Sequence, residues 1–278
     1  MSVKIVTDST CDLPADLVAQ LGVTVLPLYI NFGSQSRLDG VGVSRQEFYE
    51  RLPRYNPPPT TAAPGVDMFL ATYERLAREG ATEILSIHIS VSLSAVVNVA
   101  RVAAKETQAV PVTVFDSRQL SMGTGLLVQA AAQAADEHGT TKEIIALLED
   151  QVPRTHTFAL LDTLEYLRRS GRMNGALAAM GNLLQVKPLL RMYDGKATAE
   201  RIRTRERAVE RMIEIIAEIA PLERAALLHS HAPGRAEALR QRIQQLLPQG
   251  DVPSVEVTPA IGVHVGPGAV GFACVAIR

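Results

Sequence analysis

Short apolar runs alternate with longer helical patterns along most of this chain, and polar turn residues follow nearly every run. The runs have the length and composition of β-strands and lie at residues 3–7, 23–28, 84–90, 112–115, 158–161, 225–229, 255–258 and 272–277. Helical patterns lie between several of them, at residues 68–79, 93–108, 125–138, 142–150, 207–219 and 234–247. Because strands that alternate with helices usually pair through crossover connections, the sequence predicts an α/β fold with largely parallel sheets.

The chain has 278 residues, a length at which one compact core commonly gives way to two. We expect the division near residues 151–154, where a helical pattern ends and Pro153 interrupts it. This places an N-terminal α/β domain at residues 1–152 and a C-terminal α/β domain at residues 153–278. Thr140 and Glu143 also have the spacing of a capping box, which marks the start of a helix.

Charge and cysteine content exclude several classes of protein. The chain has 28 Lys and Arg against 29 Asp and Glu, so it lacks the basic excess with which proteins bind nucleic acid. Its two cysteines, Cys11 and Cys274, have no spacing typical of a zinc site or a disulfide framework. No apolar run reaches the roughly 18 residues of a membrane span, and residues 1–7 have no features of a signal peptide, so we expect none. We expect a cytoplasmic protein with no metal, no cofactor, no nucleic-acid partner and no membrane span.

Hydroxyl-bearing side chains gather where the predicted strands end. These patches lie at residues 7–14, 61–64, 89–94, 170–172 and 264–268, and the last two add Arg172 and His264. Such groups suit the capture of a small anion. Hydrophobic residues make up 47% of the chain but aromatic residues only 4%, so the interior is mainly aliphatic. An aliphatic interior is ordinary core, and it would equally suit a pocket for a hydrocarbon chain.

Two serine-rich segments follow strands and precede helical patterns. Ser92 is a plausible N-cap, which would leave Ser94 in the first helical turn with its hydroxyl and N–H turned toward a carboxylate. The loop at residues 116–125 has the same context, and its Ser and Thr either cap the next helix or face an anion. His88 lies inside a predicted strand and is interpreted as a structural or surface histidine.

Sequence motifs for catalysis are weak or missing. Residues 266–271 match GxGxxG by letter, but a strand and not a helix follows them, so we interpret them as a tight glycine turn. The chain has neither a GxxxxGK[ST] phosphate loop nor an HExxH zinc motif. A serine acyl hydrolase could be assembled from Ser94, His264 and either Asp116 or Asp162. It would lack the GxSxG elbow that exposes the nucleophile, and it stays as an alternative.

Arginine recurs at every second residue from Arg201 to Arg207. On a strand this spacing would place four guanidinium groups on one face, and the face would be either solvated or suited to an acidic partner. Arg172, next to Gly171, is a second candidate for such docking.

Several segments, taken in order, resemble the DegV family of bacterial fatty acid-binding proteins. The matching segments are VTDSTCDLP at 6–14, TAAP at 61–64, ISVSLS at 89–94, VFDS at 114–117, LEYLRRSGR at 164–172, LQVKP at 184–188 and HVGPG at 264–268. The resemblance covers nearly the whole chain. It departs from the family pattern at Ala62, Ala63, Ala95, Ser170 and Met173, which stand where the family has more polar, more flexible or different apolar residues.

The resemblance implies a two-domain fold, with a Rossmann-like parallel sheet in the N-terminal domain and an α/β C-terminal domain. It implies one long-chain fatty acid in an apolar tunnel, with Thr61 and Ser94 bound to the carboxylate and His264 beside it. Arg172 and Arg203 would belong to the surrounding network or to a docking surface. The partner would be a separate ATP-dependent fatty acid kinase, so this chain would be a lipid-binding carrier and not the catalyst. A carrier of another small anion remains an alternative.

Overall fold

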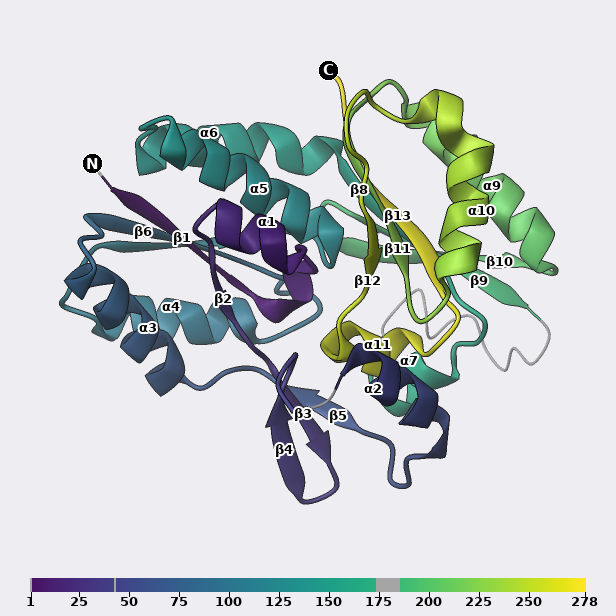
Figure 1. The fold of residues 1–278 in the computed structure, drawn as a ribbon, viewed down its shortest axis with the longest axis horizontal. Coiled ribbons are helices and arrows are strands. Elements are labelled where there is room, and N and C mark those ends of the chain that lie inside the picture. The colour runs from purple at the N-terminus through teal and green to yellow at the C-terminus, as the bar shows by residue number, and fades with distance from the viewer. Residues whose placement is uncertain (1, 43, 174–185) are drawn as a thin grey trace.

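The computed structural model describes residues 2–42, 44–173 and 186–278 and contains three β-sheets. The first is a parallel sheet in the order β2-β1-β6-β7 (Figure 1). Its strands are β1 (Val3–Asp8), β2 (Thr24–Leu26), β6 (Glu83–His88) and β7 (Val112–Asp116). The runs of Val, Ile and Leu in β1 and β6 are buried because helices cover both faces of this sheet.

Helices form a layer on each side of the parallel sheet. Figure 1 shows α3 (Val66–Arg78) and α4 (Val96–Glu106) on one side, and α1 (Ala15–Gln20), α5 (Met122–Asp136) and α6 (Thr141–Gln151) on the other. This half confirms the parallel arrangement predicted from the alternating pattern.

The second sheet has six strands in the order β10-β9-β8-β13-β11-β12. They are β8 (Thr155–Leu160), β9 (Lys187–Tyr193), β10 (Lys196–Ile202), β11 (Leu222–His229), β12 (Ser254–Glu256) and β13 (Val270–Ala276). All neighbouring pairs are antiparallel except β11 and β12. The prediction of largely parallel sheets is therefore wrong for this half, because the apolar run that marks a buried strand such as β13 is the same whether its neighbours are parallel or antiparallel.

Helices α9 (Arg205–Ile219) and α10 (Pro233–Ile243) cover the outer face of the second sheet, and α5 packs against its inner face. A third, small sheet has the order β4-β3-β5, with β3 (Tyr29–Phe32), β4 (Gln35–Leu38) and β5 (Thr60–Ala62). The other α-helices among the described residues are α2 (Arg45–Arg51), α7 (Glu165–Arg169) and α11 (Pro259–Val265). Short 3₁₀ turns lie at Ser9–Cys11, Leu52–Arg54, Val152–Arg154 and Gln244–Leu246. None of the described helices is long and apolar enough to cross a bilayer.

The main hydrophobic core continues across the predicted division between the two domains. Ile5 and Leu127 from the N-terminal half belong to the same buried cluster as Leu228 and Ile261 from the C-terminal half. Helix α5 connects them, since it contacts β1 on one side and β8, β11 and β13 on the other. The two sheets therefore share packing through this helix, and the boundary at residue 152 stays a prediction.

Local helix signals were predicted with mixed success. Thr140 and Glu143 form the expected capping box at the start of α6. Ser92 does not cap α4, because a turn closed by the N–H groups of Leu93 and Ser94 on the Ser90 carbonyl delays the helix until Val96. At the start of α5, Ser121 makes no side-chain cap, since its hydroxyl donates to Asp12.

The predicted stripe of four arginines on one strand face is wrong. Strand β10 ends at Ile202, and Thr204 caps the next helix by accepting a hydrogen bond from the Arg207 N–H. Arg201 lies on the strand and Arg203 in the bend that follows, whereas Arg205 and Arg207 lie on α9. A capping threonine in the middle of an alternating run was the signal that the strand would end there.

A buried chain of hydrogen bonds connects β1 with β6 in the parallel sheet. The Asp8 carboxylate lies 3.0 Å from His88 Nδ1, His88 Nε2 lies 2.7 Å from Ser86 Oγ, and Ser86 Oγ lies 2.9 Å from the Tyr73 hydroxyl. All four side chains are fully buried. Burial acts to raise the pKa of Asp8, but its bonds to His88, Thr10 and the Ile89 N–H outweigh this and lower it. His88 is therefore a structural histidine, and not a surface histidine, which was the other interpretation of the sequence.

Candidate functional site

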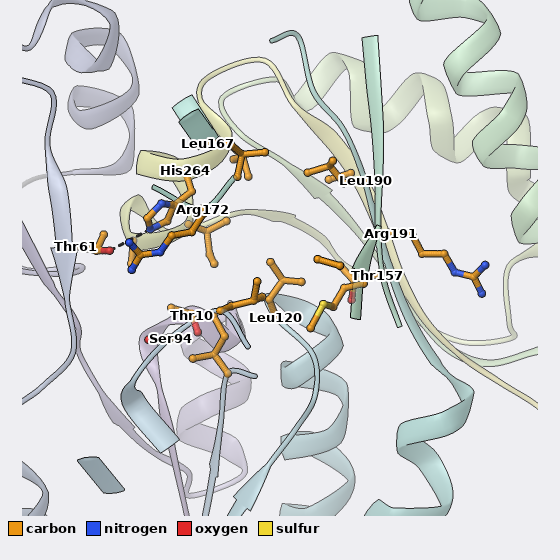
Figure 2. Close-up of a pocket in the computed structure, with 18 of the residues that line it drawn as sticks. Thr10, Thr61, Ser94, Leu120, Thr157, Leu167, Arg172, Leu190, Arg191 and His264 are labelled. Atoms are coloured by element: carbon orange, nitrogen blue, oxygen red, sulfur yellow. Dashed lines mark hydrogen bonds between the residues drawn. The ribbon is translucent and has the colours of Figure 1, made fainter. Parts of the chain in front are cut away.

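A largely aliphatic cavity lies between the inner face of the second sheet, helix α11 and the loops that follow β1 and β6 (Figure 2). Its volume is about 120 Å³, far more than the 10–15 Å³ that one water molecule requires. The apolar lining residues are Leu28, Ile89, Leu93, Leu120, Phe158, Ala159, Leu167, Leu190, Met192, Ala197, Ala260, Ile261 and Val265. The polar ones are Thr10, Thr61, Ser94, Thr157, Arg172, Arg191 and His264. Such a lining suits a hydrocarbon with one polar end.

Thr61 and His264 meet at one end of this cavity. Thr61 lies on β5 and His264 on α11, and the Thr61 Oγ1 atom lies 3.0 Å from His264 Nε2. Figure 2 shows the two side chains pointing toward one another from different elements. The structure therefore brings together two residues that are 203 positions apart in the sequence and that were both predicted for the site.

His264 is held neutral by its surroundings. Burial lowers its pKa to about 3, and the nearby positive charge of Arg172 contributes to the shift. Its Nδ1 atom is buried and has no hydrogen-bond partner within the described part of the chain. A buried N–H without an acceptor is costly, so we assign the hydrogen of the neutral ring to Nε2. With Nε2–H donated to Thr61 Oγ1, the Thr61 hydroxyl hydrogen is left to donate to a ligand.

Ser94 also lines the cavity, and Figure 2 shows it close to Thr10 across from the Thr61–His264 pair. It lies two residues before the start of α4, so the prediction that it belongs to the first helical turn is wrong. Its N–H donates to the Ser90 carbonyl at 3.1 Å and is therefore already used. The hydroxyl is the group that Ser94 can offer to a ligand.

Arg172 and Arg203 have different positions. Arg172 lines the cavity beside the Thr61–His264 pair, and its Nη1 donates to the Ser170 carbonyl at 2.9 Å. Arg203 is exposed in the bend between β10 and α9 and is not part of the cavity wall. Of these two arginines, Arg172 is therefore the one that can add a positive charge to the polar end.

A glycine turn holds the end of α11 in place. Gly266 has a φ of +74°, which favours glycine, and a side chain there would come within 2.3 Å of the Tyr166 ring. The Ser230 hydroxyl donates to the Gly266 carbonyl at 2.6 Å. Strand β13 follows at Val270, as expected from the sequence, so the GxGxxG letters mark a packed turn next to His264.

The groups of the alternative hydrolase do not assemble in the described structure. His264 Nε2 is bonded to Thr61 and not to Ser94, and Nδ1 has no carboxylate partner among the described residues. Asp116 accepts from the Val91 and Arg118 N–H groups, and Asp162 forms ion pairs with Lys187, Arg205 and Arg235. This geometry gives no support to a Ser94–His264 hydrolase.

Three polar wall residues were missed in the sequence. Thr10 lies in the recognised N-terminal segment, but no signal distinguished it from its neighbours there. Thr157 is buried in β8 and donates to Gln119 Oε1 at 3.0 Å. Arg191 lines the wall with its inner part, while its guanidinium points away from the cavity and lies over the rings of Phe158 and Tyr193. A lone Arg in an apolar strand gave no periodic pattern by which it could be found.

No cluster of three or more metal-binding side chains occurs in residues 2–42, 44–173 and 186–278. The site consists of neutral hydroxyls, one neutral imidazole and one guanidinium. These groups donate hydrogen bonds and suit an anion better than a cation.

Comparisons with known proteins agree with this architecture. A family model described as "Uncharacterised protein, DegV family" matches residues 2–276. A DegV domain-containing protein of Streptomyces coelicolor is 38% identical over 274 residues, which are 97% of this chain and 96% of the relative. A structure described as fatty acid binding of a DegV family protein from Thermus thermophilus has a TM-score of 0.91 at 34% identity and covers 100% of both chains.

A second solved structure, of the Bacillus subtilis DegV described as a fatty acid binding protein, has a TM-score of 0.90 at 28% identity and covers 99% of both chains. The expected α/β architecture, with a parallel sheet and a second sheet, is thereby confirmed. The matches extend over essentially the full length of this chain and of its relatives, and the chain therefore belongs to the DegV family.

Proposed function

We propose that this protein binds a fatty acid, with the acyl chain in the aliphatic cavity and the carboxylate at the Thr61–His264 end. The observation that carries the proposal is the pairing of Thr61 and His264 at the polar end of a cavity whose other walls are mostly apolar. The fatty acid binding described for the Thermus thermophilus and Bacillus subtilis relatives supports it.

The chemistry of the polar end matches a carboxylate. A carboxylate removed from water must keep hydrogen-bond donors, and the hydroxyls of Thr61 and Ser94 supply two. The neutral His264 ring orients the Thr61 hydroxyl and avoids a second buried charge. Arg172 supplies one positive charge at the same end, so the ionised acid would enter without leaving an unpaired charge in the protein.

Extraction of the purified protein into organic solvent, followed by mass spectrometry, tests the ligand directly. We expect about one fatty acid for each chain. A protein that yields no lipid, and that binds no added fatty acid in a calorimetric titration, contradicts the proposal. Another co-purified anion would favour the alternative carrier.

The proposed carboxylate contacts can be tested separately. Thr61→Val with Ser94→Ala should weaken fatty acid binding, because each lost hydrogen bond to a charged group costs roughly 1.5–3 kcal/mol, or about 10- to 150-fold in Kd. Thr113→Val is a matched control, since Thr113 is exposed on β7 outside the cavity. Unchanged affinity in the double variant would show that the carboxylate lies elsewhere.

We further propose that the protein is a carrier, and that it presents the bound acid to a separate ATP-dependent fatty acid kinase that forms the acyl phosphate. The missing phosphate-binding loop supports this division of labour, and Arg203 is exposed where a partner can reach it. Its location in the cytoplasm stays a prediction, in keeping with the two free cysteines.

Arg203→Ala should spare fatty acid binding and slow acyl phosphate formation by the kinase. The matched control is Arg101→Ala, because Arg101 is exposed on α4. Equal loss of binding and transfer would place Arg203 in the pocket. Covalent labelling of Ser94 by a fluorophosphonate would support the hydrolase and contradict the carrier.

A further inference from the structure

Three side chains from the N-terminal half bind three consecutive residues of the C-terminal half. An Arg45 Nη1 donates to the Glu256 carbonyl, the Tyr49 hydroxyl donates to the Val257 carbonyl at 2.9 Å, and the Thr258 N–H donates to Asp12 Oδ1 at 2.7 Å. Each bond reaches the backbone, so it holds the path of the chain and not a single side chain.

The segment held in this way leads directly into α11. Thr258 is the N-cap residue of this helix, and its carbonyl accepts from the Ile261 and Gly262 N–H groups. Helix α11 then contributes four cavity-wall residues: Ala260, Ile261, His264 and Val265. Because α11 has only seven residues, a shift at Thr258 is carried along the helix to His264.

The three holding side chains belong to the same half as the two hydroxyl donors of the proposed carboxylate site. Thr61 and Ser94 lie in the N-terminal half, whereas His264 comes from α11, so the site is complete only when the two halves are in register. Asp12 and Tyr49 are each only 1% exposed, which leaves them little freedom to move. Asp12 is also bonded to the Ser121 hydroxyl at the start of α5.

We propose that Asp12, Arg45 and Tyr49 are positioning residues of the carboxylate site, which set the 3.0 Å approach of His264 to Thr61 by holding Glu256, Val257 and Thr258. The proposal rests on the function proposed above and adds a role that the cavity lining itself does not reveal. None of the three needs to touch the fatty acid hydrocarbon. A site of this kind tolerates displacements of only about 0.5 Å, so loss of one of these hydrogen bonds should shift His264 relative to Thr61 enough to weaken binding.

Tyr49→Phe removes one hydrogen bond while keeping the ring, and it is the main test. Tyr73→Phe is its matched control, since Tyr73 is equally buried but its hydroxyl bonds to Ser86 and not to residues 256–258. We expect Tyr49→Phe to raise the Kd for palmitate about two- to tenfold, the range for one neutral hydrogen bond. Tyr73→Phe should leave the Kd within about twofold even if it lowers stability similarly.

A double-mutant cycle separates positioning from general destabilisation. In a Thr61→Val background His264 has lost its partner, so Tyr49→Phe should no longer change the Kd. Equal effects of Tyr49→Phe in both backgrounds would overturn the proposal, as would equal effects of Tyr49→Phe and Tyr73→Phe.

The ring nitrogens of His264 give a readout that needs no ligand. The ¹⁵N NMR shifts of His264 should change in Tyr49→Phe and stay unchanged in Tyr73→Phe. Asp12→Asn, which keeps an acceptor for the Thr258 N–H, should retain the parent shifts, whereas Asp12→Ala should not. If the parent binds no fatty acid, the proposed function fails, and these shifts still decide the positioning role. Unchanged His264 shifts in Tyr49→Phe would overturn it.

Discussion

Replacing Gly262 by alanine sets helix propensity against packing in the middle of α11. Gly262 is buried, and an added Cβ would lie 2.6 Å from the Tyr49 hydroxyl, 2.8 Å from Tyr49 Cε1 and 2.9 Å from Phe48 Cε1. Alanine gains up to about 1 kcal/mol over glycine in a helix. Phe48 and Tyr49 are 0% and 1% exposed, so neither ring has open space into which it can retreat.

The packing penalty should outweigh the gain in propensity. Overpacking a core costs about 1–3 kcal/mol, and displacing Tyr49 also weakens its hydrogen bond to Val257, at about 0.5–1.5 kcal/mol. After subtraction of the helix gain, Gly262→Ala should lower the free energy of unfolding by about 0.5–3.5 kcal/mol. Since Tyr49 moves, the affinity for a fatty acid should fall as well.

Gly234 provides a control for the propensity term within the same chain. It lies on α10, and a Cβ added there meets nothing within 4 Å. Gly234→Ala should therefore leave stability unchanged or raise it by up to about 1 kcal/mol. The chain has no Trp, so urea unfolding is best followed by circular dichroism. An equal stabilisation of both variants would refute the packing argument at Gly262.

Three further outcomes follow from buried titratable groups. Burial raises the pKa of Asp12 to about 7, with Asp39 adding to the shift and Arg45 and the bonds from Ser121 and Thr258 opposing it. Between these pH values the folded state binds a proton that the unfolded state has lost, so the free energy of unfolding should fall as pH rises from about 4 to 7. Urea unfolding of Asp12→Asn should show a smaller fall over this range. An unaltered dependence of the free energy of unfolding on pH would contradict this. Because the pKa of His264 is lowered to about 3, NMR should detect no titration of its ring between pH 5 and 8, and a titration near 6.5 would contradict its burial. His88→Leu should destabilise the protein by about 3–5 kcal/mol in urea, since it leaves the Asp8 carboxylate buried without its imidazole partner, and a loss below about 1 kcal/mol would contradict that role.

The parts of the fold that depend on local signals could be predicted from the sequence. The capping box at Thr140 involves residues three apart, and the apolar runs of β1 and β6 are long enough to identify without neighbours. Strand direction in the second sheet could not be predicted, because a strand such as β13 is apolar on both faces. Nothing in such a run records whether its partner runs parallel or antiparallel.

Thr61, Ser94 and His264 were predicted as one site through the family resemblance, and the structure places all three at the cavity. The hydrogen bond between Thr61 and His264 joins two elements far apart in sequence, so it could not be predicted from the sequence around either residue. Tyr49 was not predicted at all, since its hydroxyl acts through a backbone carbonyl, a group that every residue carries.

The buried chain from Asp8 through His88 and Ser86 has the same order of contacts as the relay of a serine hydrolase, yet it is sealed from solvent. Its N–H and O–H protons can therefore exchange with water only when the packing around β1, β6 and α3 opens. Their exchange rates, measured by NMR in deuterated solvent, would report the opening of this strand and helix packing and not of a single loop. The same chain is bonded through Asp8 to Thr10 and Ile89 of the cavity wall, so its proton exchange would also respond to a ligand that stiffens this wall.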